Sequence, residues 1–363
     1  MTPTTAARRP LGALVARALS GSWRQSPPPL ALSLEQLTEV VPLLLKSGCG
    51  ALAWWRIHET PMTQHLLAAA ELHDAFRMQV LNAAIQERQI AEVFALLRAA
   101  GVEPVLIKGW AAARLYAHGG VRPCTDIDLC VDPGRLAAAQ AVVCRPPGSR
   151  YPVDLTHSEV TDVAGLIARS GLVPLGGAQV RIPCPEDHLR LLCIHALKHA
   201  VCRPQWLCDI AAAVERRPAT FSWQGLLGDN RRHAGWIASA IGLAHLLLGA
   251  DVAGTPVETA ARHLPRWLVR SVLAVWSNPD TFRLVPREFA ATSVHSLAVG
   301  LRDRWANPIQ SSIMMNAAIN GFPRLPIQVA LYGQRVVKFL RHPPGAPLHP
   351  GGRPLEDVEQ RRS

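Results

Sequence analysis

Two short apolar runs, each with charged residues at one end, constrain the fold of this chain more than any other feature. The first, Val105 to Ile107, is followed directly by Lys108 and Gly109, and the second is the alternating stretch Asp126-Ile127-Asp128-Leu129. An apolar run that ends at glycine is typical of a buried β-strand, and alternation is typical of a strand with one polar face. Residues 110–118, between the two runs, are rich in helix formers. We therefore predict a strand, a helix and a second strand in this order.

Asp126 and Asp128 are predicted to form a metal site. Successive side chains of a strand point to opposite faces, so the two carboxylates share one face, with Cα atoms roughly 6.6 Å apart. Adjacent carboxylates repel each other and need a cation, and oxygen ligands of this kind suit Mg²⁺ or Mn²⁺ that also binds phosphate. The bend at Gly109 puts backbone N–H groups at a helix N-terminus beside that site, where a phosphate can bind, and Lys108 is expected to contact a phosphate oxygen. The alternative is a solvated strand end that binds nothing.

These residues resemble a known family. Lys-Gly, a short helix carrying Tyr116, then Arg122 and Asp-x-Asp are similar to the signature of the polymerase-β-type nucleotidyltransferase superfamily. More narrowly, they resemble a bacterial nucleotidyltransferase family with this Lys-Gly form between two helical regions, over about residues 34 to 220. Two departures stand out: Trp110 follows Gly109 where the superfamily usually has serine, and only about two dozen residues separate Asp128 from Asp154, which suggests a lost hairpin.

The resemblance implies a role for each residue of the site. Asp126 and Asp128 would hold the metal-bound triphosphate, and Lys108 and Gly109 would contact phosphate. A third carboxylate on a later strand would complete the metal site, and the candidate is Asp154, with Glu159 as its substitute. Arg122 is expected to pair with a phosphate or with Asp126.

The pattern of elements predicts an α+β fold, in which a small mixed β-sheet nucleotidyltransferase core is flanked by helical regions. Ser33 and Gln36 form a capping-box pattern that starts the first helix, and Pro185-Glu186-Asp187 starts the helices after the core. The predicted boundaries are a flexible leader at 1–30, an N-terminal helical region at 31–101, the α/β core at 102–184, a C-terminal helical domain at 185–341 and a disordered tail at 342–363. Within the core we expect strands at 104–108, 126–131, 151–156 and 176–182, and a helix at 133–143. Later helices are expected at 205–214, 234–249, 256–276, 308–320 and 326–340.

Composition narrows the class of protein. The net charge of +11 comes from arginine, because only four of the 38 basic residues are lysine, so a nucleic-acid partner is possible but not favoured. The eight cysteines form no C-x-x-C pair, which favours reduced thiols in a cytoplasmic protein. The longest uncharged apolar run, residues 236–250, is too short for a membrane span, and no membrane insertion is expected.

His195 and His199 lie four residues apart, which is compatible with zinc, but no third ligand at suitable spacing follows. We expect these residues to pack against the core or to meet the substrate, with Lys198 able to reach a phosphate. Asp209 resembles an acid of the family's helical region, and a structural role is favoured for it.

The resemblance implies an enzyme that uses Mg²⁺ (or Mn²⁺) to move a nucleoside monophosphate from an NTP, with ATP expected, to a hydroxyl or phosphate acceptor, releasing pyrophosphate. A small molecule, a peptide or an RNA end would all serve as acceptor. One alternative is a toxin-type transferase of an abortive-infection system, and another is a nucleotide-binding or scaffold protein that has lost catalysis.

Overall fold

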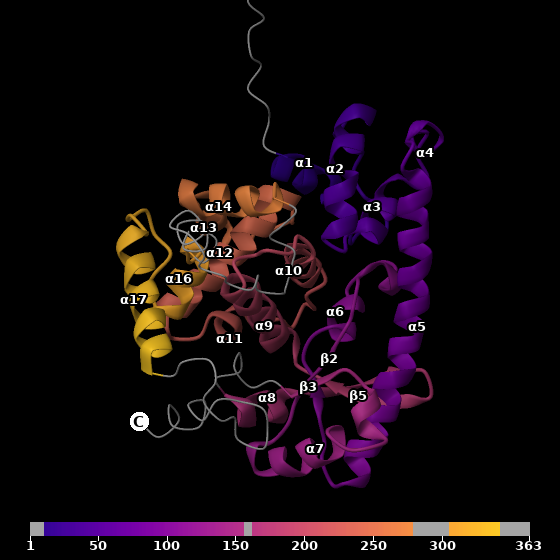
Figure 1. Ribbon diagram of the computed structural model, residues 1–363, viewed down its shortest axis with the longest axis vertical. Coiled ribbons are helices and arrows are strands. Elements are labelled where there is room, and N and C mark those ends of the chain that lie inside the picture. The colour runs from indigo at the N-terminus through magenta and orange to yellow at the C-terminus, as the bar shows by residue number, and fades with distance from the viewer. Residues whose placement is uncertain (1–10, 156–161, 279–304, 342–363) are drawn as a thin grey trace, which may run out of the picture.

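The computed structural model describes residues 11–155, 162–278 and 305–341 (Figure 1). It is mostly helical, with a three-stranded mixed sheet and a separate two-stranded hairpin, so the predicted α+β class is confirmed. Of the helices described here, none combines the length and the apolar character that a membrane crossing requires. No disulfide links the eight cysteines, all of which lie in the described segments.

The elements follow one another as three groups along the chain. The N-terminal helices are α1 (Leu11–Leu19), α2 (Leu34–Lys46), α3 (Gly50–Ile57), α4 (Met62–His65) and α5 (Ala69–Ala99). The core comprises β1 (Val105–Leu106), α6 (Trp110–Ala113), η1 (Gly119–Val121), β2 (Ile127–Cys130), η2 (Pro133–Arg135), α7 (Leu136–Val143), η3 (Gly148–Arg150), β3 (Val153–Leu155), α8 (Val163–Arg169), β4 (Gly171–Leu175) and β5 (Ala178–Ile182). The C-terminal helices are α9 (Pro185–Lys198), α10 (Gln205–Glu215), α11 (Trp223–Leu227), α12 (Arg231–Leu248), α13 (Glu258–Arg262), α14 (Arg266–Trp276), α16 (Pro308–Met314) and α17 (Leu325–Arg341).

The sheet has the order β1-β2-β3. β1 pairs antiparallel with β2, whereas β2 pairs parallel with β3, which is possible because α7 carries the chain back across the sheet. β4 and β5 form an antiparallel hairpin, and β5 contacts β1. The expected strand at 176–182 is therefore confirmed, while β4 and α8 were not predicted.

The two faces of the sheet are covered by different helices. Ile127 and Leu129 pack with Phe94 of α5 and Ala139 of α7 in one apolar cluster. Cys130 belongs to a second cluster, which includes Ile107 and two residues from the other side, Leu166 of α8 and Leu191 of α9. The side chains of β2 that alternate with Ile127 and Leu129 therefore face α8 and α9.

Helix α5 connects the N-terminal helices to the core. Its 31 residues give a length of about 46 Å, and Figure 1 shows it running from α4 past α6 to the level of α7. Gly101, with φ of +71°, follows its end, in the left-handed conformation that glycine adopts at helix C-termini. The capping box of Ser33 and Gln36 at the start of α2 is also present.

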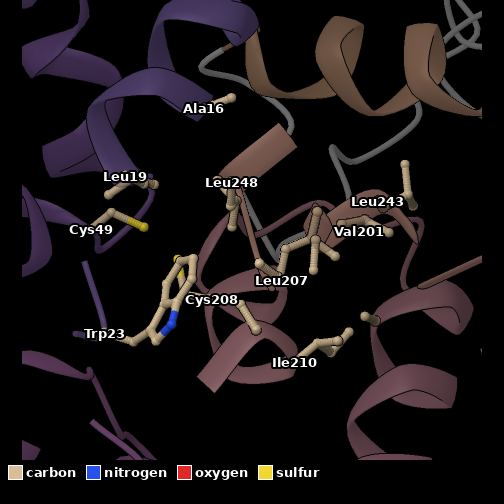
Figure 2. Packing of buried hydrophobic residues seen from close by; sticks show 14 of the residues in the cluster. Ala16, Leu19, Trp23, Cys49, Val201, Leu207, Cys208, Ile210, Leu243 and Leu248 are labelled. Atoms are coloured by element: carbon tan, nitrogen blue, oxygen red, sulfur yellow. The ribbon is translucent and has the colours of Figure 1, made fainter. Parts of the chain in front are cut away.

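The flexible leader predicted for residues 1–30 is wrong from Leu11 onward. α1 buries Leu14, Val15 and Leu19, and the side chain of Trp23 is 1% exposed (Figure 2). These side chains pack against α10 and α12, and the Trp23 indole donates a hydrogen bond of 2.8 Å to Glu215. The many arginines and prolines of this segment suggested disorder. Its apolar residues nevertheless form one face of a helix, and the large helical core buries that face. Residues 1–10 lie outside the described segments.

Several predicted helices are shorter than expected. The helix expected at 110–118 ends at Ala113, and the one expected at 256–276 is divided before Pro265 into α13 and α14. Proline disfavours the helical conformation of the residue before it, which explains the division. Helix α16 ends at Met314, six residues before the predicted end, whereas α17 agrees closely with its prediction. The disordered tail predicted for 342–363 lies outside the described residues.

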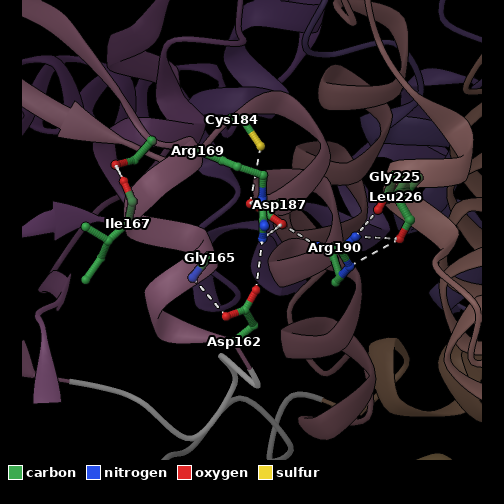
Figure 3. A network of polar contacts seen from close by, with 10 residues as sticks. Asp162, Gly165, Ile167, Arg169, Cys184, Asp187, Arg190, Gly225 and Leu226 are labelled. Carbon is green, nitrogen blue, oxygen red and sulfur yellow. Dashed lines mark hydrogen bonds and ion pairs between the residues drawn. The ribbon is translucent and has the colours of Figure 1, made fainter.

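A polar junction fixes α8 relative to α9 and α11 (Figure 3). The buried carboxylate of Asp187 accepts hydrogen bonds of 2.8 and 3.2 Å from Arg169 of α8. Arg190 also bonds to Asp187, and it donates to the carbonyl oxygens of Gly225 and Leu226 at α11. Asp187 thereby joins the helix that covers the polar face of β2 to the C-terminal helices.

A second junction, entirely buried, joins the core to α10. Asp209 is 0% exposed and accepts hydrogen bonds from Arg122 at 2.8 and 3.1 Å and from the Tyr116 hydroxyl at 2.7 Å. Burial, followed by the nearby charge of Asp209, holds the pKa of Tyr116 well above its usual range, so the phenol stays a donor. The structural role expected for Asp209 is supported by these contacts.

His188 of α9 lies close to this junction. It is 5% exposed, and its Nε2 has no hydrogen-bond partner within the described residues. Burial lowers the pKa of His188 to about 4; Asp209 opposes the shift, and Arg122 and Arg114 add to it. The imidazole is therefore neutral at pH 7.

We expect Asp209→Ala to lower the free energy of unfolding by about 3–5 kcal/mol, because it leaves the buried Arg122 charge without a partner. Tyr116→Phe removes a single hydrogen bond and should cost about 1 kcal/mol. Urea unfolding followed by circular dichroism measures both. Asp74→Ala, which removes an exposed acid of α5, is the matched control and should change stability by less than about 0.5 kcal/mol. A cost for Asp209→Ala no larger than that of the control would contradict the junction.

His188 should make the protein less stable in acid. Since the pKa of His188 is about 4 in the fold and about 6.5 in the unfolded chain, the unfolded state takes up a proton first as the pH falls. Stability is therefore lost between about pH 6.5 and pH 4, by up to ~3 kcal/mol. His188→Gln should remove this part of the pH dependence, measured by unfolding at several pH values, whereas the exposed His263→Gln should leave it unchanged. Parallel curves for wild type and His188→Gln would sink the prediction.

Candidate active site

The bend after β1 brings the Lys-Gly segment against the start of β2. Gly109 has φ of +62° and ψ of −117°, a conformation that residues with a side chain avoid. A Cβ atom at Gly109 would lie 3.3 Å from the carbonyl oxygen of Asp126. The same carbonyl accepts a hydrogen bond of 3.2 Å from Gln86 of α5. Glycine thus permits a close approach of backbone to backbone beside the first carboxylate.

The parallel pairing of β2 and β3 sets Asp128 beside Asp154. The two residues are register partners, so their side chains leave the sheet on the same face. Asp126 stands one residue before β2, and strand alternation gives it the face of Asp128, opposite Ile127. Asp126 and Asp154 are exposed and Asp128 is partly buried. The short connection from Asp128 to Asp154 therefore still brings the two acids together, through α7 and a parallel strand.

Lys108 forms an ion pair with Asp128. Its Nζ lies 3.1 Å from Oδ1 of Asp128, and the two side chains are only 11% and 17% exposed. A charge pair with so little access to water is held more strongly than a surface pair. Asp128 is thus placed where it binds a positive charge.

The donor set suits a hard divalent cation that arrives with a substrate. Among the described residues, no group of three or more His, Cys, Asp or Glu side chains is arranged to hold a metal ion. Mg²⁺ is commonly bound by one or two carboxylates together with substrate phosphates, and Asp126 and Asp128 can supply the protein's share. Glu159, the substitute for Asp154, lies outside the described residues.

Trp110 points away from the carboxylates. Its indole belongs to the apolar cluster of Ile127 and Leu129, on the α5 face of the sheet, and its Nε1 donates a hydrogen bond of 2.9 Å to Glu87. A tryptophan therefore fits directly after Gly109 without filling the polar face. It supplies no hydroxyl there, so any contact with phosphate at this bend comes from the backbone and Lys108.

Arg122 pairs with Asp209 and not with Asp126. Its guanidinium also donates to the Pro123 carbonyl oxygen at 2.9 Å and contacts Cys124. Burial, the largest effect, raises the pKa of the Cys124 thiol, on which the charges of Arg122, Asp209 and Asp128 also act. Arg122 therefore holds the segment that leads into β2, and its direct contact with a phosphate stays a prediction.

The histidines of α9 pack against an indole. His195 and His199 have ring centroids 4.7 Å apart, and each ring lies against Trp206 of α10. This arrangement agrees with the expectation that they pack or meet the substrate.

Two contributors to the site, Gln86 and Glu87, were not found from the sequence. Neither carries a local signal, because the residues they bond, Asp126 and Trp110, follow them by 40 and 23 positions. Only the packing of α5 on the sheet brings them there.

A wide surface depression of about 1230 Å³ lies elsewhere, at the end of α10. Phe221, Trp223 and Arg217 line it. One of its two acids, Glu215, accepts hydrogen bonds from Trp23 and Arg24. None of the site residues predicted from the sequence lines this depression.

Comparison with known proteins identifies the family. No curated protein and no solved structure gives a match. A family model described as "Uncharacterised nucleotidyltransferase" matches residues 35–144 and 152–248, together more than half of the chain. The match includes Lys108, Gly109, Asp126, Asp128 and Asp154, as well as α9 and α10. The chain therefore belongs to this family of uncharacterised nucleotidyltransferases.

Proposed function

We propose that this protein is an active Mg²⁺-dependent nucleotidyltransferase that moves a nucleoside monophosphate from an NTP, with ATP preferred, to an acceptor. The observation that carries the proposal is the juxtaposition at the start of β2: Asp128 beside Asp154, and the Gly109 bend against Asp126. Family membership supports the reaction class, and the site supplies the residues.

Asp126 and Asp128 would bind Mg²⁺ (or Mn²⁺), with Asp154 as a third ligand. When bound, the ion neutralises the triphosphate and stabilises the charge that develops on pyrophosphate as it leaves. Lys108, which lies 3.1 Å from Asp128, is within reach of the same phosphates once its carboxylate partner holds a metal. The Gly109 bend lets a phosphate approach the backbone closely, and Arg122 is proposed to add positive charge nearby.

In the reaction, an acceptor oxygen forms a bond to the α-phosphorus as the bond from phosphorus to the bridging oxygen of pyrophosphate breaks. If the acceptor is a hydroxyl, Asp154 takes its proton, because it is exposed on the same face as Asp128. A phosphate acceptor brings its own negative charge and needs no base. Holding the two reactants in line accounts for much of the rate enhancement in such a site.

The acceptor is a small molecule, a peptide or an RNA end carrying one of these groups. A toxin of an abortive-infection system would use the same chemistry on a cellular target. A nucleotide-binding scaffold without catalysis would keep the site but transfer nothing. Trp110, which provides no hydroxyl at the bend, is the feature that favours this last alternative.

Transfer should depend on both acids. With α-labelled ATP, Mg²⁺ and cell extract, wild type should label an acceptor, whereas Asp126→Asn and Asp128→Asn should reduce labelling at least about 100-fold, because even the loss of a residue that supports a metal ligand costs 10–100-fold. Asp132→Asn, an exposed acid beyond the other end of β2, is the matched control and should keep full activity.

The outcomes separate the alternatives. Tight binding of ATP without transfer by wild type would favour the scaffold. Growth arrest on expression, abolished by Asp128→Asn, would favour the toxin. Equal labelling by wild type and both variants would contradict the metal-binding role proposed for these two acids.

Lys108 should compete with metal at Asp128. We expect Lys108→Met to bind Mn²⁺ about tenfold more tightly than wild type when no nucleotide is present, since a cation within 3.1 Å of the ligand is removed. The same variant should bind ATP more weakly, because a phosphate contact is lost. Titration of Mn²⁺ followed by electron paramagnetic resonance measures the first effect, and calorimetry with ATP measures the second. Lys46→Met, at the exposed end of α2, is the control, and unchanged Mn²⁺ affinity in Lys108→Met would contradict the competition.

A further inference from the structure

The turn between α9 and α10 has an unusual backbone. Ala200 and Val201 have φ values of +55° and +52°, in the left-handed region that residues other than glycine rarely occupy. For the β-branched Val201 this conformation is a clear outlier, and strain of this kind gathers where a functional site needs a particular geometry. The turn is held in place because the Trp276 indole donates a hydrogen bond of 2.8 Å to the Val201 carbonyl oxygen.

The turn brings together three flat rings. His195 and Trp206 meet edge to face with centroids 4.8 Å apart, and His199 lies 4.7 Å from His195 and 5.6 Å from Trp206. His199 is exposed, and His195 and Trp206 are partly exposed. Side chains that only filled the core would not need this access to water. We call these three residues the ring cluster.

His195 and Lys198 lie on the side of α9 that meets the sheet. Leu191 packs with Val105 and Ile107, which fixes the side of α9 that meets the sheet. His195 and Lys198 follow Leu191 by four and seven residues, and at about 100° per residue both lie within roughly 40° of it around the helix. They are about 6 and 10 Å further along the helix axis.

Helix α10 returns along the segment that leads into β2. Oε1 of Gln205 and Cγ of Pro123 both lie within 4.0 Å of the position of a Cβ at Gly48, so the first turn of α10 lies beside Pro123. Trp206 is the next residue of this turn, and three residues later Asp209 holds Arg122. Trp206 therefore belongs to a helix whose first turn lies near the segment that leads into β2.

Another explanation for the histidines is that they stand at the C-terminus of α9, where cationic groups are favoured by the helix dipole. That explanation accounts for His195 and His199 alone. It accounts neither for the partly exposed indole that faces them nor for the strained turn.

We propose that the ring cluster is the surface on which the nucleobase of the substrate stacks. The inference rests on the proposed function and adds to it a place for the base, with the positive charge of Lys198 on the same side of α9 as His195. Nucleobases stack on aromatic side chains, so the surface would favour nucleotides over inorganic polyphosphate.

Binding of Mg²⁺-ATP and of Mg²⁺-tripolyphosphate tests the proposal, because tripolyphosphate has the phosphates but no base. Trp206→Leu should weaken the binding of ATP by about 10- to 100-fold in calorimetry and change that of tripolyphosphate by less than about twofold. Trp206→Phe should keep most of the ATP affinity. Trp223→Leu, a partly exposed tryptophan of α11, is the matched control and should behave like wild type.

Three results would overturn the proposal: unchanged ATP affinity in Trp206→Leu, an equal loss for both ligands, or wild type that binds tripolyphosphate no less tightly than ATP. Failure of the proposed function has another signature, which is that Asp128→Asn binds both ligands as wild type does. A readout that needs no variant is photolabelling of wild type with 8-azido-ATP. Label is expected on the peptides of α9 and the first turn of α10, and label confined to other peptides would overturn the assignment.

Discussion

The arrangement of this protein depends on the hydrogen bonds and the ion pair made by the buried carboxylate of Asp209. This carboxylate accepts three hydrogen bonds from the core, two from Arg122 and one from Tyr116, and none of its surface is exposed to solvent. A charge so enclosed is tolerable only while its partner stays in position. The chain just before Asp126 is therefore fixed to α10, and the polar end of β2 keeps its place relative to the C-terminal helices.

Several elements of the fold could be predicted because each of them carries a signal in its local sequence. The alternation around Asp128 and the glycine after Lys108 define their strands, and the capping box at Ser33 defines a helix. Elements without such a signal were missed. β4 shows little alternation of apolar and polar residues, and the apolar residues of α1 lie among arginines and prolines. The partner of Arg122 could not be foreseen either, since tertiary packing alone brings Asp209 to it.

The two faces of the small sheet have different roles. Ile127 and Leu129 pack on α5 and α7 and so hold β2 in place. The acids that alternate with them lie on the opposite face. That face is covered by α8 of the core and by α9 of the C-terminal helices, which Asp187 holds together. The proposed metal site therefore lies on the face of the sheet where these two groups of elements meet.

Helix α5 also limits how this architecture can vary. Consecutive residues in its middle, Gln86 and Glu87, hold the Asp126 carbonyl and the Trp110 indole, while its first turns pack against α3. One residue inserted between these two regions would turn one half by about 100° relative to the other. Such an insertion would therefore break one of the two sets of contacts, whereas an insertion in the loops at either end of α5 would leave the phase between them unchanged.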